Sequence, residues 1–155
     1  MDVSAPLVLQ PHWGNLYQGA AADAGIQSIE DGLMVVCMNK GEVDDTLIDR
    51  VNIHGLRVLW LDDSPTDLLE DWEVFAHVEA DIAWLSRGKP LLRHCGAGVS
   101  RASYGNLPLI MRVRHLGYDD ALALLRTVRP QAQPNQGFEA HLRRLESQLL
   151  EATLP

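Results

Sequence analysis

The chain has 155 residues, which is enough for one domain with a hydrophobic core and too few for two ordinary domains. Hydrophobic residues make up 46% of the chain, charged residues make up 22%, and the net charge is −8. This composition is typical of a globular protein, and the negative charge argues against nucleic acid or an anionic membrane as a partner, because both need a broad basic surface.

The sequence also limits where the protein is expected to work. No apolar run reaches the ~18 residues that a membrane-spanning helix needs. The opening residues MDVSAPLVLQ lack the basic start of a signal peptide. The cysteines, Cys37 and Cys95, are too few and too far apart for a disulfide framework. We therefore expect a cytoplasmic protein, in a reducing compartment, folded as one domain over residues 1–155.

The first part of the chain predicts short strands. The runs LVLQ (7–10) and NLYQGAAADA (15–24) predict an edge strand followed by a tight turn. Three short apolar runs predict buried strands, namely GLMVVCM (32–38), LRVLWL (56–61) and PLLRH (90–94). Cys37 lies in the first of these three runs, where a plain core thiol is expected.

One helix is predicted between the second and third of these runs. Thr66 has the chemistry of an N-cap, and Gly88 and Pro90 end the helix after about Ser86. The helical spacing predicts a buried stripe made of Leu68, Trp72, Phe75, Ala76, Ile82 and Ala83. The four tryptophans of the chain are all expected to serve packing.

The chain after residue 101 is predicted to be helical. One helix runs over about 102–115, where Pro108 is expected to cause a kink or an early end. A second helix starts at an Asp119 cap and ends at Pro130, and a third carries Phe138, Leu142, Leu145 and Leu149 on one face. Strands that alternate with helices predict an α/β domain with a mostly parallel central sheet and helices on both faces.

The string RHCGAGVSRAS (93–103) lies where a predicted strand meets a predicted helix. Its small residues let the backbone curl so that several N–H groups point at one spot, and the helix N-terminus adds its positive end. Arg101 can then hold two oxygens of an anion with its planar guanidinium group. The string therefore predicts a loop that binds a tetrahedral phosphoryl group through Gly96, Ala97, Gly98, Val99, Ser100 and Arg101.

Cys95, at the base of this loop, is the predicted nucleophile. The positive field of the loop favours its thiolate, which attacks phosphorus, and the thiophosphoryl intermediate is then hydrolysed. His94 is expected to organise the loop through hydrogen bonds, and Ser100 to donate to the departing sulfur. The full string His-Cys-x-x-Gly-x-x-Arg disfavours the alternative of an inert core cysteine. No metal site is expected, because adjacent His94 and Cys95 cannot easily bind one ion and no further ligand cluster is present.

The string HCGAGVSR closely resembles the signature of the dual-specificity branch of the cysteine-dependent protein tyrosine phosphatases. The segments LYQGAAADA (16–24), LDDSPTDLL (61–69) and RPQAQPNQGF (129–138) are similar to other parts of that family. The resemblance implies a protein tyrosine phosphatase-like fold in which Asn135 and Gly137 form a turn and cap and Phe138 anchors the core. Two features depart from the family pattern: Ala102 stands where Ser or Thr is usual, and Gly105 and Pro108 interrupt a helix that is usually aliphatic.

The resemblance also implies that an aspartate of the segment 61–69 gives a proton to the leaving group. Asp62 fits this role if Leu61, residues 66–69 and Trp72 keep their usual family offsets. Asp63 fits it if the triplet Asp-Ser-Pro is the anchor. Asp62 is preferred and Asp63 stays an alternative. Cys37 also has an alternative role, as a redox partner that captures Cys95 in a disulfide.

Together these features predict a phosphate monoester hydrolase that needs no metal or cofactor and forms a cysteinyl-phosphate intermediate. Its expected substrates are phosphotyrosine and phosphoserine/threonine in proteins. One alternative is a phosphoinositide, phosphoglucan or nucleotide, although residues 96–99 carry no Lys or Arg to meet further phosphates. Another is a weakly active phospho-binding pseudophosphatase. The remaining histidines show no ligand spacing and are predicted to be surface or turn residues, namely His12, His54, His77, His115 and His141.

Overall fold

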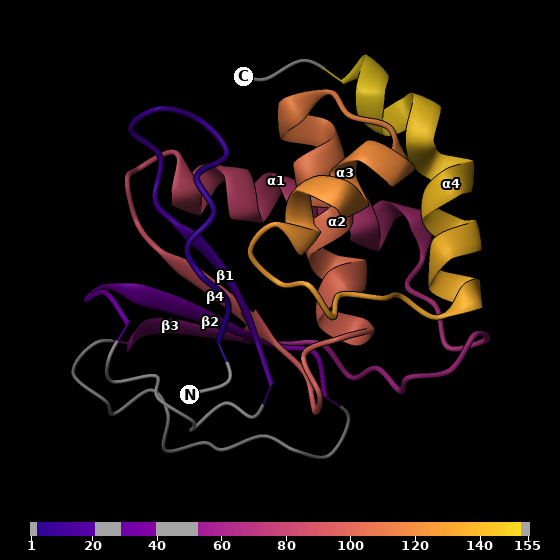
Figure 1. The fold of residues 1–155 in the computed structure, drawn as a ribbon, viewed down its shortest axis with the longest axis horizontal. Coiled ribbons are helices and arrows are strands. Elements are labelled where there is room, and N and C mark those ends of the chain that lie inside the picture. The colour runs from indigo at the N-terminus through magenta and orange to yellow at the C-terminus, as the bar shows by residue number, and fades with distance from the viewer. Residues whose placement is uncertain (1–2, 21–28, 40–52, 153–155) are drawn as a thin grey trace.

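The computed structural model describes residues 3–20, 29–39 and 53–152 (Figure 1). Its elements in chain order are β1 (Leu16–Gly19), β2 (Leu33–Cys37), β3 (Ile53–Val58), α1 (Asp71–Leu85), β4 (Leu91–His94), α2 (Arg101–Arg114), α3 (Tyr118–Arg126) and α4 (Gln136–Glu151). The predicted strands 32–38 and 90–94 are confirmed as β2 and β4. The three helices expected after residue 101 are also present. The predicted strand 56–61 is β3, which begins three residues earlier and ends three residues earlier.

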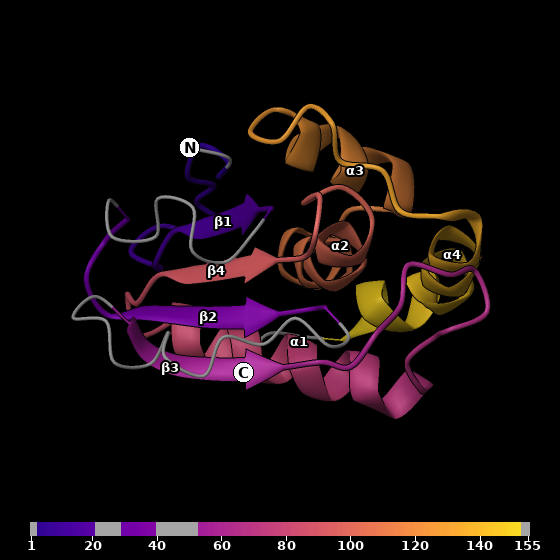
Figure 2. The same ribbon diagram turned by 90° about the horizontal axis from the view of Figure 1, so that it is seen from below.

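The strands form a parallel sheet in the order β1-β4-β2-β3. Figure 2 shows all four arrowheads pointing the same way, toward the loop that leads into α2. In open parallel sheets, the carboxyl ends of the strands form the edge at which ligands bind. Because β4 lies between β1 and β2, the residue that follows it, Cys95, is placed in the interior of this edge.

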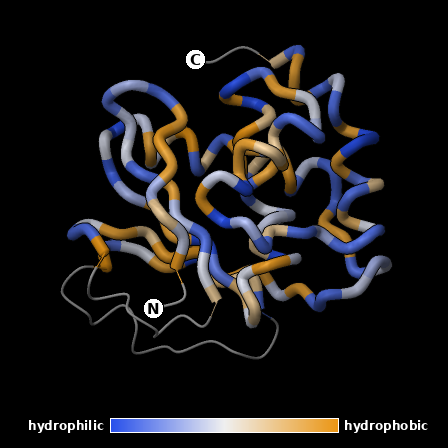
Figure 3. Tube along the Cα trace, viewed as in Figure 1, coloured by the Kyte–Doolittle hydropathy of each residue, from blue (hydrophilic) through white to orange (hydrophobic). Residues whose placement is uncertain are grey.

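The two faces of the sheet have different partners. Val36 and Leu91 join the main hydrophobic core, to which all four helices contribute. The next strand positions, Val35 and Leu92, join a smaller cluster on the opposite face. Within the residues that the structure describes, helices cover only the first face, whereas helices on both faces were predicted. In Figure 3, hydrophobic and hydrophilic residues alternate along α4, which turns one face toward the core.

The start of α1 corrects one prediction. The helix begins at Asp71, and its N-cap is Glu70 rather than Thr66. The Glu70 side chain and the backbone N–H of Glu73 interact, while the Glu73 side chain accepts from the N–H of Glu70, a reciprocal arrangement known as a capping box. Thr66 therefore belongs to the loop before the helix, and the N-cap lies four residues later than expected.

The predicted stripe of α1 is confirmed at Ile82, and Phe75 packs partly buried against the core, whereas Trp72, Ala76 and Ala83 are exposed. The helix buries Val74, Val78, Ile82 and Leu85, together with Asp81. Asp81 forms ion pairs with Arg57 of β3 and Arg93 of β4. Because Asp81 is charged, it interrupts the apolar spacing of the buried face, so the hydrophobic pattern did not indicate this face.

Two of the four tryptophans are exposed rather than packed. Trp60 is 63% exposed and Trp72 is 70% exposed, while Trp13 and Trp84 pack against the main core. The packing prediction is therefore wrong for Trp60 and Trp72. Both exposed residues lie near the segment that connects β3 to α1.

Three smaller predictions also change. The first strand of the sheet is β1, in the first part of the segment 15–24 where a turn was expected, while residues 21–24 of that segment lie outside the described residues. Leu7 of the expected edge strand forms an isolated bridge with Leu16. The N-cap of α3 is Gly117 instead of Asp119. Pro108 does not shorten α2, which runs through it to Arg114 because the surrounding residues are buried in the core.

Candidate active site

Cys95 directly follows β4 and is buried, with 2% of its surface exposed. Its backbone N–H donates to the carbonyl of Gly19 in β1 (3.3 Å). Its Sγ accepts a hydrogen bond from the backbone N–H of Ala102, in the first turn of α2 (3.4 Å). The sulfur thus lies at the positive end of a helix and accepts a hydrogen bond from its first turn.

Residues 96–100 form a loop whose carbonyl groups are bound by the surrounding protein. The Ala97 and Gly98 carbonyls accept from the guanidinium of Arg129 (3.2 and 3.0 Å), and Gly98 also accepts from Gln18 (3.1 Å). The Val99 carbonyl accepts from the backbone N–H of Gln133 (2.9 Å) and from the Ser103 hydroxyl. Holding these oxygens away from the centre of the loop removes groups that would repel an anion.

Gly98 is the residue that lets the loop close. Its φ angle is +68°, in the left-handed region. A Cβ atom at this position would lie 2.3 Å from a guanidinium nitrogen of Arg129 and 2.6 Å from the carbonyl of Gly19. Both the backbone conformation and the close approach of β1 therefore require glycine.

His94 and Gly96 occupy the start of the loop. His94 is buried at the end of β4, in register with Gly19 and Cys37, and its carbonyl accepts from the N–H of Met38 (2.9 Å). The N–H of Gly96 donates to the Asn39 side chain, which follows β2 (2.9 Å). The loop is thus attached to both strands that flank β4.

Ser100 makes different contacts from those expected. Its hydroxyl donates to Oδ1 of Asp63 (2.7 Å) and accepts from the N–H of Asn135 (3.0 Å). A hydroxyl has one proton to donate, so in this geometry the donor to the sulfur is the N–H of Ala102 and not Ser100. Ser103 does not replace the missing family hydroxyl at position 102 either, because it donates to Val99.

The segment Leu61–Leu69, which we call the acid loop, lies against the start of α2. Nη1 of Arg101 donates to the carbonyl of Leu61 (3.2 Å). Oδ1 of Asp63 accepts from both Ser100 and the Asn135 amide (2.7 and 2.8 Å). Asp62 is exposed, and its N–H donates to the carboxylate of Asp67 (2.7 Å). The structure therefore brings both aspartates to the phosphate loop region but engages their side chains differently.

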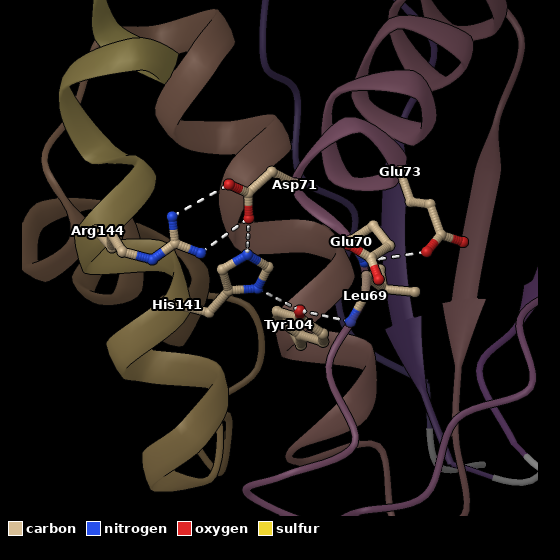
Figure 4. A network of polar contacts seen from close by, with 7 residues as sticks. All are labelled: Leu69, Glu70, Asp71, Glu73, Tyr104, His141 and Arg144. Atoms are coloured by element: carbon tan, nitrogen blue, oxygen red, sulfur yellow. Dashed lines mark hydrogen bonds and ion pairs between the residues drawn. The ribbon is translucent and has the colours of Figure 1, made fainter.

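A chain of polar contacts, buried at Tyr104 and His141 and exposed at its far end, holds the end of the acid loop (Figure 4). The N–H of Leu69 donates to the hydroxyl of Tyr104 in α2 (3.1 Å), which contacts Nδ1 of His141 in α4 (2.6 Å). Nε2 of His141 contacts Asp71, which also binds Arg144 through two hydrogen bonds. Burial raises the pKa of the Tyr104 phenol, so Tyr104 stays protonated and can donate to His141.

His141 is thus a buried connector, and its predicted place at the surface is wrong. Only 4% of its surface is exposed. Hydrogen bonds from Arg144 and His141 lower the pKa of the Asp71 carboxyl, which keeps it charged as the last member of the chain. No local sequence pattern could indicate these contacts, because the partners lie 37 and 70 residues from His141.

The start of α4 also packs on the acid loop. Asn135 is the N-cap of α4, where its side chain accepts from the N–H of Phe138 (2.9 Å), and the same side chain donates to Asp63. A Cβ atom on Gly137 would lie 1.9 Å from the carbonyl oxygen of Pro65. The cap and anchor roles expected for Asn135 and Phe138 are confirmed, and Asn135 has a second role in holding Asp63.

Sequence reasoning missed the residues that support the phosphate loop from outside. Gln18 and Arg129 are buried polar side chains, with 1% and 3% of their surface exposed, and both reach Gly98. Their burial could not be predicted, because a glutamine in a short strand and an arginine before a proline are both usually found at the surface.

Cys37 ends β2 in register with His94 and is buried, and it forms no disulfide with Cys95. A redox role for Cys37 stays a prediction. Within the described ranges 3–20, 29–39 and 53–152, no three His, Cys, Asp or Glu side chains are grouped to hold a metal ion. In the same ranges, no helix is long and apolar enough to cross a membrane.

Comparison with known families identifies the domain. The model of the dual specificity phosphatase catalytic domain matches residues 16–148, which include the phosphate loop, the acid loop and the start of α4. The chain belongs to the dual specificity phosphatase family. Members of this family are cysteine-dependent phosphatases, and the resemblance noted in the sequence is confirmed.

Individual relatives agree with this assignment. Dual specificity protein phosphatase 12 of Mus musculus is 38% identical over 101 residues, which cover 61% of this chain and 28% of the mouse protein. The Rattus norvegicus protein of the same name is 33% identical over 137 residues, covering 83% of this chain and 38% of that protein. The chain thus spans well under half the length of these two relatives.

Solved structures show the same fold. A mouse dual specificity phosphatase crystallised with zinc tungstate superimposes with a TM-score of 0.79 at 22% identity, covering 96% of this chain and 88% of the other. This similarity confirms the single-domain α/β fold with a parallel sheet that the sequence predicted.

Proposed function

We propose that this chain hydrolyses phosphate monoesters of phosphotyrosine and phosphoserine/threonine in proteins, through a cysteinyl-phosphate intermediate and without a metal ion. The observation that carries the proposal is the environment of Cys95. Its sulfur accepts from the N–H of Ala102 at the start of α2, beneath a loop whose Ala97, Gly98 and Val99 carbonyls are bound elsewhere. Family membership supports phosphatase chemistry of this kind.

In the first step, the Cys95 thiolate attacks phosphorus. An S–P bond forms while the P–O bond to the leaving group breaks. Arg101 and the backbone N–H groups of the loop bind the phosphoryl oxygens, whose charge is spread in the transition state. Arg101 is suited to this role because it begins α2 at the end of the loop and its guanidinium can form two parallel hydrogen bonds.

Asp62 donates a proton to the leaving oxygen in this step. Asp62 lies on the acid loop next to Leu61, whose carbonyl is bound by Arg101. Asp63 is less suited, because its Oδ1 already accepts from Ser100 and Asn135 and holds the acid loop to the phosphate loop. Asp63 stays the alternative general acid.

In the second step, water attacks phosphorus and the S–P bond breaks. Asp62, now deprotonated, accepts a proton from this water, and inorganic phosphate is released. The departing sulfur takes the electron pair, and the N–H of Ala102 stabilises the returning thiolate. The backbone N–H of Ala102 thus stabilises the departing sulfur, a role that was predicted for the Ser100 hydroxyl. Ser100 instead positions Asp63 and the start of α4.

The experiment that tests the proposal is hydrolysis of an aryl phosphate and of phosphopeptides with EDTA present. We expect turnover by the wild type, no detectable turnover by Cys95→Ser, and near wild-type rates for Cys37→Ser, which is the matched control. Full activity of Cys95→Ser, or loss of wild-type activity in EDTA, would overturn the mechanism. Turnover of a phosphoinositide, phosphoglucan or nucleotide in preference to every phosphopeptide would overturn the substrate class.

A further inference from the structure

We propose that a cleft beside the acid loop binds the part of the substrate that flanks the phosphorylated residue. The cleft prefers a flank in which an apolar side chain is followed by Lys or Arg, so that the enzyme selects phosphoproteins with this sequence. This inference rests on the proposed phosphatase activity and adds a substrate preference to it. It is carried by an exposed apolar surface, by its charge, and by its position beside the predicted acid.

The cleft has a volume of about 390 Å³. Residues 58–61, which lead out of β3, form one wall, and residues 67–69 form another. Glu73 and His77, from the first turns of α1, complete it. Concave sites of this size that combine apolar and polar groups are the usual binding sites for ligand side chains.

The walls of the cleft expose large apolar side chains. Trp60 is 63% exposed and Leu68 is 41% exposed, and both line the cleft. The large apolar side chains of a monomeric protein are normally covered, and a group of exposed ones next to a functional site marks a binding surface. An apolar side chain of a partner would bury both residues.

The negative charge around the cleft favours a basic side chain in the bound segment. From Leu59 to Ala76 the sequence has six acidic residues and no Lys or Arg. Asp67 and Glu73 of this group line the cleft. Burial and the nearby Arg93 and Arg57 lower the pKa of His77, so the histidine in the cleft stays neutral at pH 7 and does not oppose a cation. A basic side chain complements this surface.

The position of the cleft makes its occupant a neighbour of the reacting group. Leu61 lies in one wall, and its carbonyl accepts from Arg101 (3.2 Å). Asp67 lies in another wall, and its carboxylate accepts from the N–H of Asp62 (2.7 Å). When the phosphorylated side chain of a peptide enters the phosphate loop, the residues before or after it therefore lie next to the cleft.

The test uses a panel of phosphotyrosine peptides of equal length. The flank on either side of the phosphotyrosine carries Leu-Arg, Leu-Glu, Ala-Arg or Ala-Ala, and kcat/KM is measured for each. On one of the two sides, we expect kcat/KM for the Leu-Arg peptide to exceed that for the Ala-Ala and Leu-Glu peptides by at least about tenfold. An apolar contact or a charge contact in such a site is typically worth roughly this factor.

Three variants locate the preference. Trp60→Ala should remove the preference for Leu. Glu73→Gln should weaken the preference for Arg while keeping the capping box, because Gln retains the oxygen that accepts from Glu70. Trp72→Ala is the matched control, since Trp72 is equally exposed but does not line the cleft, and it should change neither preference. All three should hydrolyse p-nitrophenyl phosphate at the wild-type rate.

Equal kcat/KM for all peptides in the wild type, or an unchanged preference in Trp60→Ala, would overturn the inference while leaving the phosphatase intact. Turnover of neither peptides nor p-nitrophenyl phosphate would instead overturn the proposed function. A wild-type dimer in sedimentation that Trp60→Ala converts to a monomer would show that a second copy of the chain covers the cleft, and would also overturn the inference.

Discussion

The phosphate loop and the acid loop are held in place by different means. Cys95, Gly98 and Ser100 of the phosphate loop are buried, and buried side chains such as Arg129 bind its carbonyl groups. The acid loop is largely exposed and is attached at three places, through Leu61, Asp63 and Leu69. The first loop is therefore packed into the folded core, while the second is a surface segment attached to it by a few polar contacts.

This difference separates two kinds of defect. A change in the phosphate loop should disturb anion binding and stability together, because the same contacts serve both. A change in the acid loop should affect proton transfer more than folding, and its effect should depend on the leaving group. Substitutions in each of the two loops can test this separation.

The largest effect in the acid loop is expected for Asp62→Asn. Removing a general acid should lower kcat/KM by ~10²–10⁴-fold for phenyl or alkyl phosphates, whose leaving groups need a proton. The loss should be much smaller for an activated ester whose phenol leaves unaided. Rates measured over a series of aryl phosphates of increasing leaving-group basicity check this dependence, and the pH profile of kcat/KM should lose its basic limb.

Asp63→Asn is the matched control for this experiment. The amide oxygen of Asn can still accept from Ser100 and Asn135, so the acid loop should keep its place and the leaving-group dependence should stay that of the wild type. If Asp63→Asn shows the leaving-group-dependent loss and Asp62→Asn does not, the roles assigned to the two aspartates must be exchanged.

Arg101→Lys should be the most damaging conservative change in the phosphate loop. Lysine keeps the charge but cannot form two parallel hydrogen bonds to the phosphoryl group, and it also loses the planar donor to Leu61. Loss of one such transition-state contact typically costs about 10²–10³-fold in kcat. Unlike the Asp62 variant, the loss should be the same for good and poor leaving groups, and a rate within a few-fold of the wild type would contradict the role of Arg101.

Gly98→Ala tests whether the phosphate loop is part of the core. The added methyl group would meet Arg129 and Gly19 in a left-handed backbone, which typically costs about 1–3 kcal/mol. We expect the midpoint of urea unfolding to fall and the affinity for tungstate or phosphate to fall with it. Gly96→Ala is a suitable control for the stability measurement, because a Cβ atom there meets only side-chain ends, Nη2 of Arg101 at 3.1 Å and the Asn39 amide at 3.8 and 4.0 Å. Unchanged stability in Gly98→Ala would show that the loop yields more easily than its contacts indicate.

The smallest effect is expected for Tyr104→Phe. This change keeps the ring stacked on Phe138, at 4.1 Å between centroids, but removes the acceptor for the N–H of Leu69 and the donor to His141. A loss of about 1–3 kcal/mol in stability is typical when buried groups lose a partner. The rate should fall a few-fold, and only for poor leaving groups. In the double variant with Asp62→Asn, this rate effect should vanish, because a displaced acid loop cannot matter once the acid is gone.

The sequence predicted the phosphate loop and its place in the fold because both depend on local pattern. Small residues between an apolar run and a helical periodicity specify a strand, a tight loop and a helix start around Cys95. The apolar faces of α4 and of β2 were also predicted, because their residues repeat with the period of a helix or form an unbroken buried run. These signals need no knowledge of which distant residues meet.

The acid loop and its supports could not be predicted in the same way. The burial of Asp81 depends on Arg57 and Arg93, which come from two other strands, so the sequence pattern pointed to the wrong face of α1. The contact of His141 with Tyr104 and Asp71 needs three helices to be assembled first. Polar residues that are buried only because of remote partners look like surface residues when the sequence is read along one segment.

The three contacts of Asn135 have a consequence for how the protein is made. Asn135 caps the last helix, binds Asp63 through its amide and donates its N–H to Ser100, so both catalytic loops meet at a residue near the end of the described chain. During synthesis on the ribosome, Cys95 and Arg101 emerge well before this residue. We expect the nascent chain to remain without activity until α4 has left the exit tunnel and folded.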